Sequence, residues 1–177
     1  METNSSMTDS EFNDVFLHHK DVLYRFAYRM TGSSSIAEDV VQDCFLVLWN
    51  KPRAYDSNLG TMRAFLIGIA RNLILKRWRR ERPHEPLDEE FFVCESIDLV
   101  TLERVEAVST AVRMLPALQR ESLILAEYEE MSLHEICVAT ESELAAVKSR
   151  LHRARQNLRH MLAPWLEGRS HVCRTRG

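Results

Sequence analysis

The sequence predicts an all-α fold of two small helical domains joined by an acidic linker. Its 177 residues suffice for one ordinary domain or two small ones. Only five glycines and five prolines occur, which predicts few turns and long helices rather than a sheet. The hydrophobic fraction of 45% and charged fraction of 28% are those of a soluble globular protein. Helix-capping patterns then divide the chain into successive helices.

The first domain is expected to cover residues 10–82, after a disordered N-terminal segment of residues 1–9. Gly32 is suited to end its first helix in a left-handed conformation. Ser35 with Glu38 forms a capping-box pattern at the start of the second helix. Thr61 can cap the third helix, which Pro83 would end. The predicted helices are 10–31, 35–50 and 61–81, with a loop at residues 51–60 between the last two.

An acidic, proline-containing stretch without clean periodicity, residues 83–98, is interpreted as the linker. The second domain is expected at residues 99–166, followed by a flexible tail at 167–177. Pro116 suits the first turn of a helix, and Ser132 with Glu135 forms another capping box. The predicted helices are 99–115, 116–130, 132–140 and 145–159.

A short helix, a tight turn and a longer basic helix, in this order, predict a helix-turn-helix motif. The longer helix has two faces. Its apolar residues recur at helical spacing and would seat it against the domain: Leu144, Val147, Leu151, Ala154 and Leu158. Its basic face fits a DNA major groove, with Lys148, His152, Arg155 and Arg159 in one stripe. The alternative is an ordinary helical hairpin with a solvated basic face.

The charge is segregated along the chain, although the formal net charge is only -3. Residues 71–82 and 148–159 are basic, whereas residues 88–98 and 127–143 are acidic. Such segregation favours a protein that meets DNA with some surfaces and a protein partner with others. No membrane-spanning run or signal peptide is evident, so we expect a cytoplasmic protein without membrane insertion, whose four scattered cysteines are reduced thiols.

Two further surfaces are predicted in the first domain. Asp39, Gln42 and Asp43 would form an exposed acidic patch on the second helix, which suggests a cationic partner. A solvated helix face is the alternative. The third helix interleaves arginines with aromatic residues, a combination suited to single-stranded DNA.

The residues of both domains resemble one family. The stretch LPALQRESLILAEYEEMSLHEI with AAVKSRLHRARQNLR resembles the C-terminal DNA-binding domain of bacterial sigma factors, in particular the extracytoplasmic-function (ECF) group. AEDVVQDCFLVLW is similar to the family's polymerase-binding helix, and RAFLIGIARNLILKRWRR to its promoter-melting helix. The resemblance extends from about Phe12 to Met161.

The resemblance implies a non-enzymatic promoter-specificity subunit of RNA polymerase. Its implied partners are core polymerase (the β′ clamp coiled coil and the β flap), promoter DNA and an anti-sigma factor. Polymerase binding is assigned to Asp39, Gln42, Asp43 and Trp49. Minus-thirty-five DNA binding is assigned to Ala145, Ala146, Lys148, Ser149, Arg150, His152, Arg153, Arg155 and Arg159. Minus-ten DNA binding is assigned to Arg53, Tyr55, Asp56, Asn58, Arg63, Arg71, Asn72, Lys76, Arg77, Arg79 and Arg80.

The chain departs from the family at the turn of the helix-turn-helix. Glu141 stands where relatives commonly carry glycine, Glu143 follows, and Ala146 replaces a frequent threonine. Carboxylates near the groove disfavour phosphates. The docking mode is still expected to be that of the family, but the minus-thirty-five sequence that this helix recognises is not predicted.

Two other classes of function are considered. A stand-alone helix-turn-helix regulator would use its first domain to dimerise or to sense a signal, but needs no strand-opening surface. A metal- or redox-sensing protein would use His134 with Cys137, or His171 with Cys173. Because a closed zinc site usually needs four ligands, we expect no metal and no cofactor.

Overall fold

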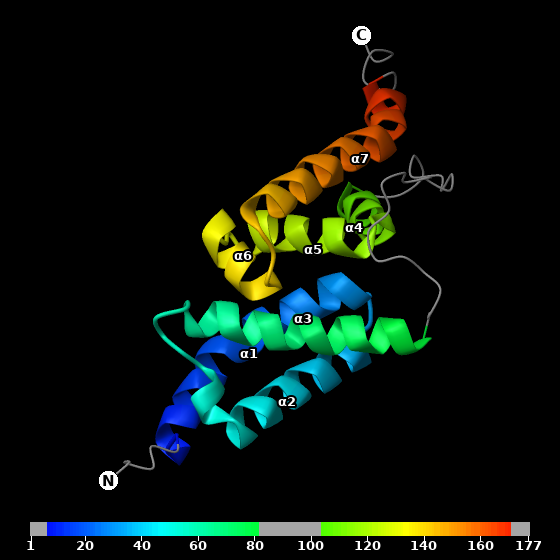
Figure 1. The fold of residues 1–177 in the computed structure, drawn as a ribbon. Helices are drawn as coiled ribbons and strands as arrows, with labels where there is room; N and C mark the ends of the chain where they lie inside the picture. Colours follow the sequence, from blue (N-terminus) through cyan, green and yellow to red (C-terminus); the bar gives the residue numbers. More distant parts are fainter. Residues whose placement is uncertain (1–6, 82–103, 171–177) are drawn as a thin grey trace.

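A computed structural model of the chain describes residues 7–81 and 104–170, with side chains described up to Ala163. All regular secondary structure in these residues is helical (Figure 1). The all-α prediction is therefore confirmed for the described part of the chain. The linker at 83–98 and the tail from residue 171, including His171 and Cys173, lie outside it.

The N-terminal domain consists of three helices that pack on one another. They are α1 (Asp9–Thr31), α2 (Ser34–Asn50) and α3 (Met62–Glu81), with a short 3-10 turn η1 (Pro52–Ala54) in the loop before α3. Their shared core contains fully buried Phe26, Met30, Leu48, Leu66 and Ile74. This core holds α2 and α3 in fixed register, and so positions the surfaces that they expose.

Local capping explains where these helices begin and end. Thr8 caps α1 in a reciprocal box with Glu11, so the helix starts one residue before the predicted Ser10. Gly32 ends it with φ 72°, as predicted. Thr61 accepts a hydrogen bond from the Ala64 N–H at 3.2 Å, which confirms the predicted cap of α3.

The capping box predicted at Ser35 and Glu38 is wrong. Ser33 caps α2 instead, because its extended backbone (φ -126°) lets its hydroxyl accept the Ile36 N–H at 3.3 Å. Ser35 then falls inside the first helical turn. Neighbouring serines offer the same chemistry, and the backbone conformation after Gly32 decides which one caps.

The C-terminal domain contains α4 (Arg104–Met114), α5 (Ala117–Leu123), α6 (Leu133–Thr140) and α7 (Leu144–Ser170). Three details differ from the prediction. Helix α7 continues to Ser170, past the predicted end at residue 159 and into the segment 167–177 expected to be a flexible tail. Pro116 is the N-cap of α5 rather than its first helical residue. A π-helical turn, η3 (Ile124–Tyr128), replaces the plain helix expected up to residue 130.

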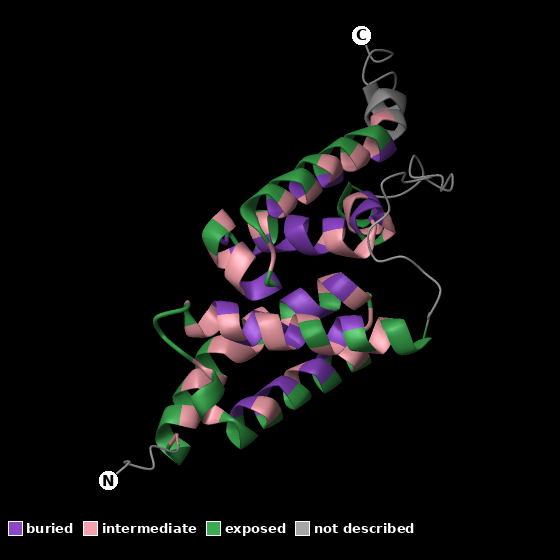
Figure 2. Ribbon diagram, viewed as in Figure 1, coloured by how far each residue is buried: buried purple, intermediate pink, exposed green. Residues whose placement is uncertain are grey.

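The two domains pack against each other over a broad surface. Helices α5 and α6 lie over α3 and α1 in Figure 1, and buried residues line both sides of the boundary in Figure 2. At Gly68 of α3, a Cβ atom would lie 3.1 Å from the Ala139 carbonyl oxygen of α6. Glycine inside a helix usually costs about 0.5–1 kcal/mol. Here it permits the close approach of α6, a contact that the sequence did not predict.

Candidate nucleic-acid and polymerase interfaces

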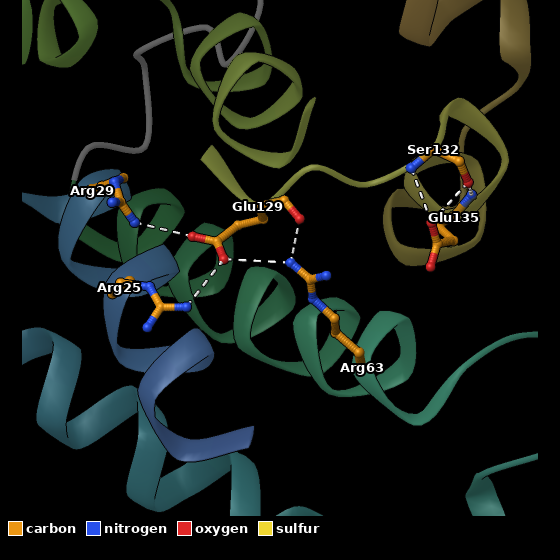
Figure 3. Close-up of polar contacts among 6 residues, drawn as sticks. All are labelled: Arg25, Arg29, Arg63, Glu129, Ser132 and Glu135. Atoms are coloured by element: carbon orange, nitrogen blue, oxygen red, sulfur yellow. Dashed lines mark hydrogen bonds and ion pairs between the residues drawn. The ribbon is translucent and has the colours of Figure 1, made fainter. Parts of the chain in front are cut away.

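The helix-turn-helix is built by α6, a three-residue turn and α7. The Ser132 hydroxyl accepts the Glu135 N–H at 3.3 Å, and the Glu135 carboxylate accepts the Ser132 N–H at 2.9 Å. The predicted capping box therefore starts α6 (Figure 3). Glu141 ends α6 in the left-handed region at φ 50°, a conformation that glycine adopts most readily. The turn is thus formed without the glycine.

Helix α7 has the two faces that its sequence predicts. Val147, Leu151 and Ala154 are buried, and Met161 continues this stripe, so that α7 seats on α5. Leu144, predicted for the same stripe, is 46% exposed because it lies at the first residue of the helix, before α5 covers the apolar face. Side chains exposed on the other side are Ala145, Lys148, Ser149, His152, Arg155 and Arg159.

Two of the proposed DNA-binding arginines on α7 are only partly exposed, and the exposed Arg155 forms an ion pair. Arg150 donates to the Ser142 hydroxyl at 3.0 Å, and Arg153 is half-buried. Arg155 donates through Nε to Glu127 at 3.0 Å, with both side chains about half exposed. A phosphate could replace Glu127 at little cost, because exposed ion pairs contribute roughly 0–1 kcal/mol.

The loop before α3 is held by local contacts. The Tyr55 and Phe65 rings pack with centroids 5.6 Å apart. The Asp56 carboxylate accepts from the backbone and side-chain N–H groups of Asn58, both at 2.9 Å. Arg53 is exposed. A groove of about 350 Å³ runs along Tyr55, Asp56 and the exposed Asn72, and its far side is formed by α6.

Some basic side chains of helix α3 are exposed to solvent, and others form ion pairs. Lys76, Arg79 and Arg80 are exposed. Arg77 pairs with Asp39 of α2 at 3.6 Å and with Glu81 at 2.9 Å. Asp39 thus has a partner within its own domain, whereas the sequence suggested only an external one.

Arg63 and Arg71, also on α3, face the C-terminal domain. Arg71 donates through Nε to Glu121 at 2.8 Å, and Arg63 lies 3.5 Å from the Glu129 carboxylate. Glu129 also pairs with Arg29 of α1 at 3.0 Å (Figure 3). The sequence did not identify these glutamates, because their partners lie 50 to 100 residues away. Both glutamates stand among other polar residues in the sequence, so no local signal marked them.

The acidic face of α2 borders an apolar groove. Asp39, Gln42 and Asp43 are exposed, as predicted. Beside them, Leu46 and Trp49 are 50% and 47% exposed, and with Phe12 and Phe16 of α1 they line a groove of about 920 Å³. An apolar groove edged by carboxylates fits a protein partner. Trp49 was predicted from the sequence to lie at this surface, whereas Leu46 was not.

Among the described residues, no group of three or more His, Cys, Asp and Glu side chains could hold a metal ion. Within the same residues, no helix is long and apolar enough to cross a membrane. Cys137, the candidate ligand beside His134, packs its half-buried side chain against the core.

Comparison with known families defines the class of this protein. Residues 15–84 match sigma-70 region 2, and residues 105–158 match sigma-70 region 4. The ECF RNA polymerase sigma factor SigW of Bacillus subtilis (strain 168) is 30% identical over 166 residues, which cover 85% of this chain and 88% of that protein. SigL of Mycobacterium tuberculosis (strain H37Rv) is also 30% identical, over 82% of this chain and 85% of that protein.

The chain belongs to the ECF group of RNA polymerase sigma factors. It is a non-enzymatic subunit that directs RNA polymerase to promoters, as its sequence predicted. The region 2 match argues against a stand-alone regulator, whose first domain would only dimerise or sense a signal.

Two solved structures share its fold. RpoE of Bartonella quintana, solved with the anti-sigma factor NepR, is 26% identical with a TM-score of 0.66, over 87% of this chain and 98% of that one. CnrH, solved with the cytosolic domain of CnrY, is 23% identical with a TM-score of 0.67, over 89% of this chain and 90% of that one.

Proposed function

We propose that three surfaces divide the work of promoter recognition. Helix α7 reads the minus-thirty-five duplex, α3 and the loop at residues 51–60 bind and open the minus-ten element, and the α1–α2 groove docks on polymerase. The observation that carries this proposal is the two-sided α7. One face is buried on α5, and the other presents Lys148, Ser149 and His152 to solvent directly after the helix-turn-helix turn.

A helix in this setting enters the major groove with its N-terminal residues at the base edges. Ala145, Lys148 and Ser149 are exposed there, whereas Arg159 lies farther along and suits a phosphate. Lys148→Ala in holoenzyme should cost about 1–3 kcal/mol of promoter binding, in a manner that depends on the minus-thirty-five sequence. Arg159→Ala should weaken all promoters alike and reduce the salt slope by about 0.9. On DNA with a scrambled minus-thirty-five element, Arg159→Ala should still weaken binding and Lys148→Ala should not. An equal loss of affinity for both variants on that DNA would contradict these roles.

For the minus-ten element, the exposed Lys76, Arg79 and Arg80 supply phosphate-binding charge at the end of α3. The groove beside Tyr55 and Asp56 has space and polar groups to receive an extruded base. Permanganate footprinting measures strand opening at the minus-ten element and so tests whether this groove contributes to it. Asp56→Ala should reduce strand opening in holoenzyme while leaving minus-thirty-five contacts in place.

Polymerase docking is assigned to the exposed Leu46 and Trp49 together with Gln42 and the carboxylate of Asp43. We infer that the partner is the β′ clamp coiled coil, and that the C-terminal domain meets the β flap. Trp49→Ala should weaken core binding by about tenfold or more, as expected for a central aromatic residue. Leu17→Ala is the matched control, because Leu17 is 53% exposed on α1 but does not line the groove.

An anti-sigma factor is proposed as a further partner, since the related RpoE of Bartonella quintana was solved with the anti-sigma factor NepR. As polymerase and chromosome share the bacterial cytoplasm, we place the protein there. Co-purification of the tagged full chain from its own organism, with and without Trp49→Ala, tests whether such a partner uses the docking groove.

The deciding experiment mixes the purified chain with core polymerase and fragmented genomic DNA, and sequences the 5′ ends of the transcripts. Promoter-specific initiation above the level of core alone is expected. It should be lost with Trp49→Ala and retained with Leu17→Ala. Transcripts identical to those of core alone would overturn the proposed function.

A further inference from the structure

A cluster of charged side chains lies between the two domains, centred on Glu129 (Figure 3). The Glu129 side chain is only 1% exposed. Its carboxylate lies 3.0 Å from Arg29, 3.5 Å from Arg63 and 3.8 Å from Arg25. Arg63 also donates to the Glu129 carbonyl oxygen. All three arginines belong to the N-terminal domain, so a single carboxylate of the C-terminal domain lies within ion-pair distance of three cations of the other.

A second pair repeats the arrangement along α3. Arg71 donates to Glu121 at 2.8 Å, and the two side chains are 13% and 0% exposed. Guanidinium groups bind carboxylates and phosphates in the same way. Glu121 and Glu129 therefore hold two α3 arginines that are assigned above to the minus-ten strand.

Apolar contacts complete the boundary. A Cβ at Gly60 would lie 3.8 Å from the Cβ of Val138, and Gly68 meets the backbone of Ala139. Helix α6 thus covers the middle of α3 and forms one side of the groove beside the base-reading loop.

This closed arrangement does not fit a promoter. The minus-ten and minus-thirty-five elements lie about 25 base pairs apart, roughly 85 Å along B-form DNA. A compact body of this size has a radius of gyration of only about 15 Å. Helices α3 and α7, linked through α6, cannot reach both elements while the domains remain packed. The domains must separate before both surfaces bind DNA.

We propose that the packing of the two domains is an autoinhibitory contact, in which Glu129 and Glu121 occupy Arg63 and Arg71 until polymerase and promoter DNA draw the domains apart. The proposal rests on the proposed function, because it takes these arginines to be ligands of the minus-ten strand. It explains why two buried acids of a DNA-binding domain face arginines rather than solvent.

The first test removes the central charge. Without the Glu129 carboxylate, three partly exposed arginines lie close together at the domain boundary with no counter-charge from Glu129, which disfavours closure. The full-length variant Glu129→Gln should show a larger radius of gyration in X-ray scattering. It should also bind single-stranded DNA carrying a minus-ten sequence, taken from a promoter mapped by run-off transcription, about tenfold more tightly than the unchanged chain. This gain corresponds to a tenfold rise in the open fraction.

Glu130→Gln is the matched control, since it removes the same charge from the next residue, which is exposed. Its radius and affinity should stay at the unchanged values. Equal behaviour of the two variants would overturn the role of Glu129.

The second test locks the closed arrangement. The Cβ separation at Gly60 and Val138 lies within the range of a disulfide. The double variant Gly60→Cys/Val138→Cys is made with Cys94→Ser, Cys137→Ala and Cys173→Ser; Cys44 is buried. When oxidised, it should lose promoter-specific transcription with core polymerase at least tenfold, and reductant should restore it. The same chain with Gly60 and Val138 unchanged controls for the oxidant.

The outcomes separate the two proposals. Full activity of the oxidised, cross-linked chain would overturn autoinhibition and leave the sigma-factor function standing. Absence of specific transcription from the unchanged chain would overturn the function itself. The scattering comparison of Glu129→Gln with Glu130→Gln does not depend on transcription, so it still decides whether Glu129 holds the domains together.

Discussion

At the scale of single residues, the thiol of Cys44 illustrates how burial controls reactivity. It is fully buried between α2 and α3 and donates to the Leu66 carbonyl oxygen at 3.4 Å. Burial raises the pKa of the Cys44 thiol to about 12. Since the thiolate is the reactive form, only roughly one molecule in ten thousand carries it at pH 8.

Cys44 should therefore resist thiol reagents in the folded protein. In a chain with Cys94→Ser and Cys173→Ser, the half-buried Cys137 should be modified first and Cys44 only on unfolding. Mass spectrometry after timed treatment with iodoacetamide measures both rates. Rapid native-state labelling of Cys44 would contradict the packing of α2 on α3.

Glu141, like Glu130, has a left-handed backbone that is unfavourable for a residue with a side chain. It adopts φ 50° and ψ 40° at the end of α6, a region that costs a residue with a Cβ about 1–2 kcal/mol. Glycine avoids this cost but loses about 0.5–1 kcal/mol of chain entropy on folding.

Glu141→Gly should accordingly raise the free energy of unfolding by about 0.5–1 kcal/mol. Glu141→Ala keeps the Cβ and should show no such gain. Urea unfolding of the two variants beside the unchanged chain provides the measurement. A gain with alanine as large as with glycine would point to the lost carboxylate rather than to the backbone.

At the scale of elements, helix α6 depends on its first turn. The backbone N–H of Ser132, followed by its hydroxyl, lowers the pKa of the Glu135 carboxyl below its ordinary value of 4.5. A carboxyl whose pKa is lower in the folded than in the unfolded state stabilises the fold above its ordinary value, and this contribution is lost as the pH falls through the folded pKa.

Ser132→Ala should destabilise the protein by about 1 kcal/mol at neutral pH, as a lost N-cap does. The difference from the unchanged chain should shrink once the pH falls below 4.5, because protonated Glu135 is a weaker acceptor for the Ser132 hydroxyl, the donor that the variant removes. Urea unfolding at a pH on either side of that value tests the sign. A difference that grows in acid would refute it.

The elements also show how far local sequence determines structure. Thr61, Ser132 and Gly32 act where predicted, since caps and left-handed ends depend on a few neighbouring residues. The π-helical turn η3 was not predictable in this way. It lies where the C-terminal domain turns to present Glu129 to α1 and α3, which is a matter of packing.

At the scale of the whole molecule, the charge pattern predicts that the free protein binds DNA more weakly than the holoenzyme does. The net charge is -3, and buried acids of one domain pair with arginines of the other. Both features weaken attraction to a polyanion before the domains separate.

The full chain alone should therefore bind promoter duplex no more tightly than about 1 µM near physiological salt, the range of nonspecific binding. Fluorescence anisotropy across a salt series tests this, with holoenzyme on the same DNA for comparison. A tight, salt-resistant complex of the isolated chain would contradict both the charge argument and the closed arrangement.

The sequence by itself determined the helices, the two-sided α7, the exposed acidic face of α2 and membership of the ECF group. These features are encoded by spacing, capping and motif over short stretches of chain. Only the tertiary structure decided that Arg63 and Arg71 face Glu129 and Glu121, that Gly68 admits α6, and that Leu46 joins Trp49 beside an apolar groove. These contacts join residues distant in sequence, and no periodicity records which buried charge will meet which partner once the domains pack.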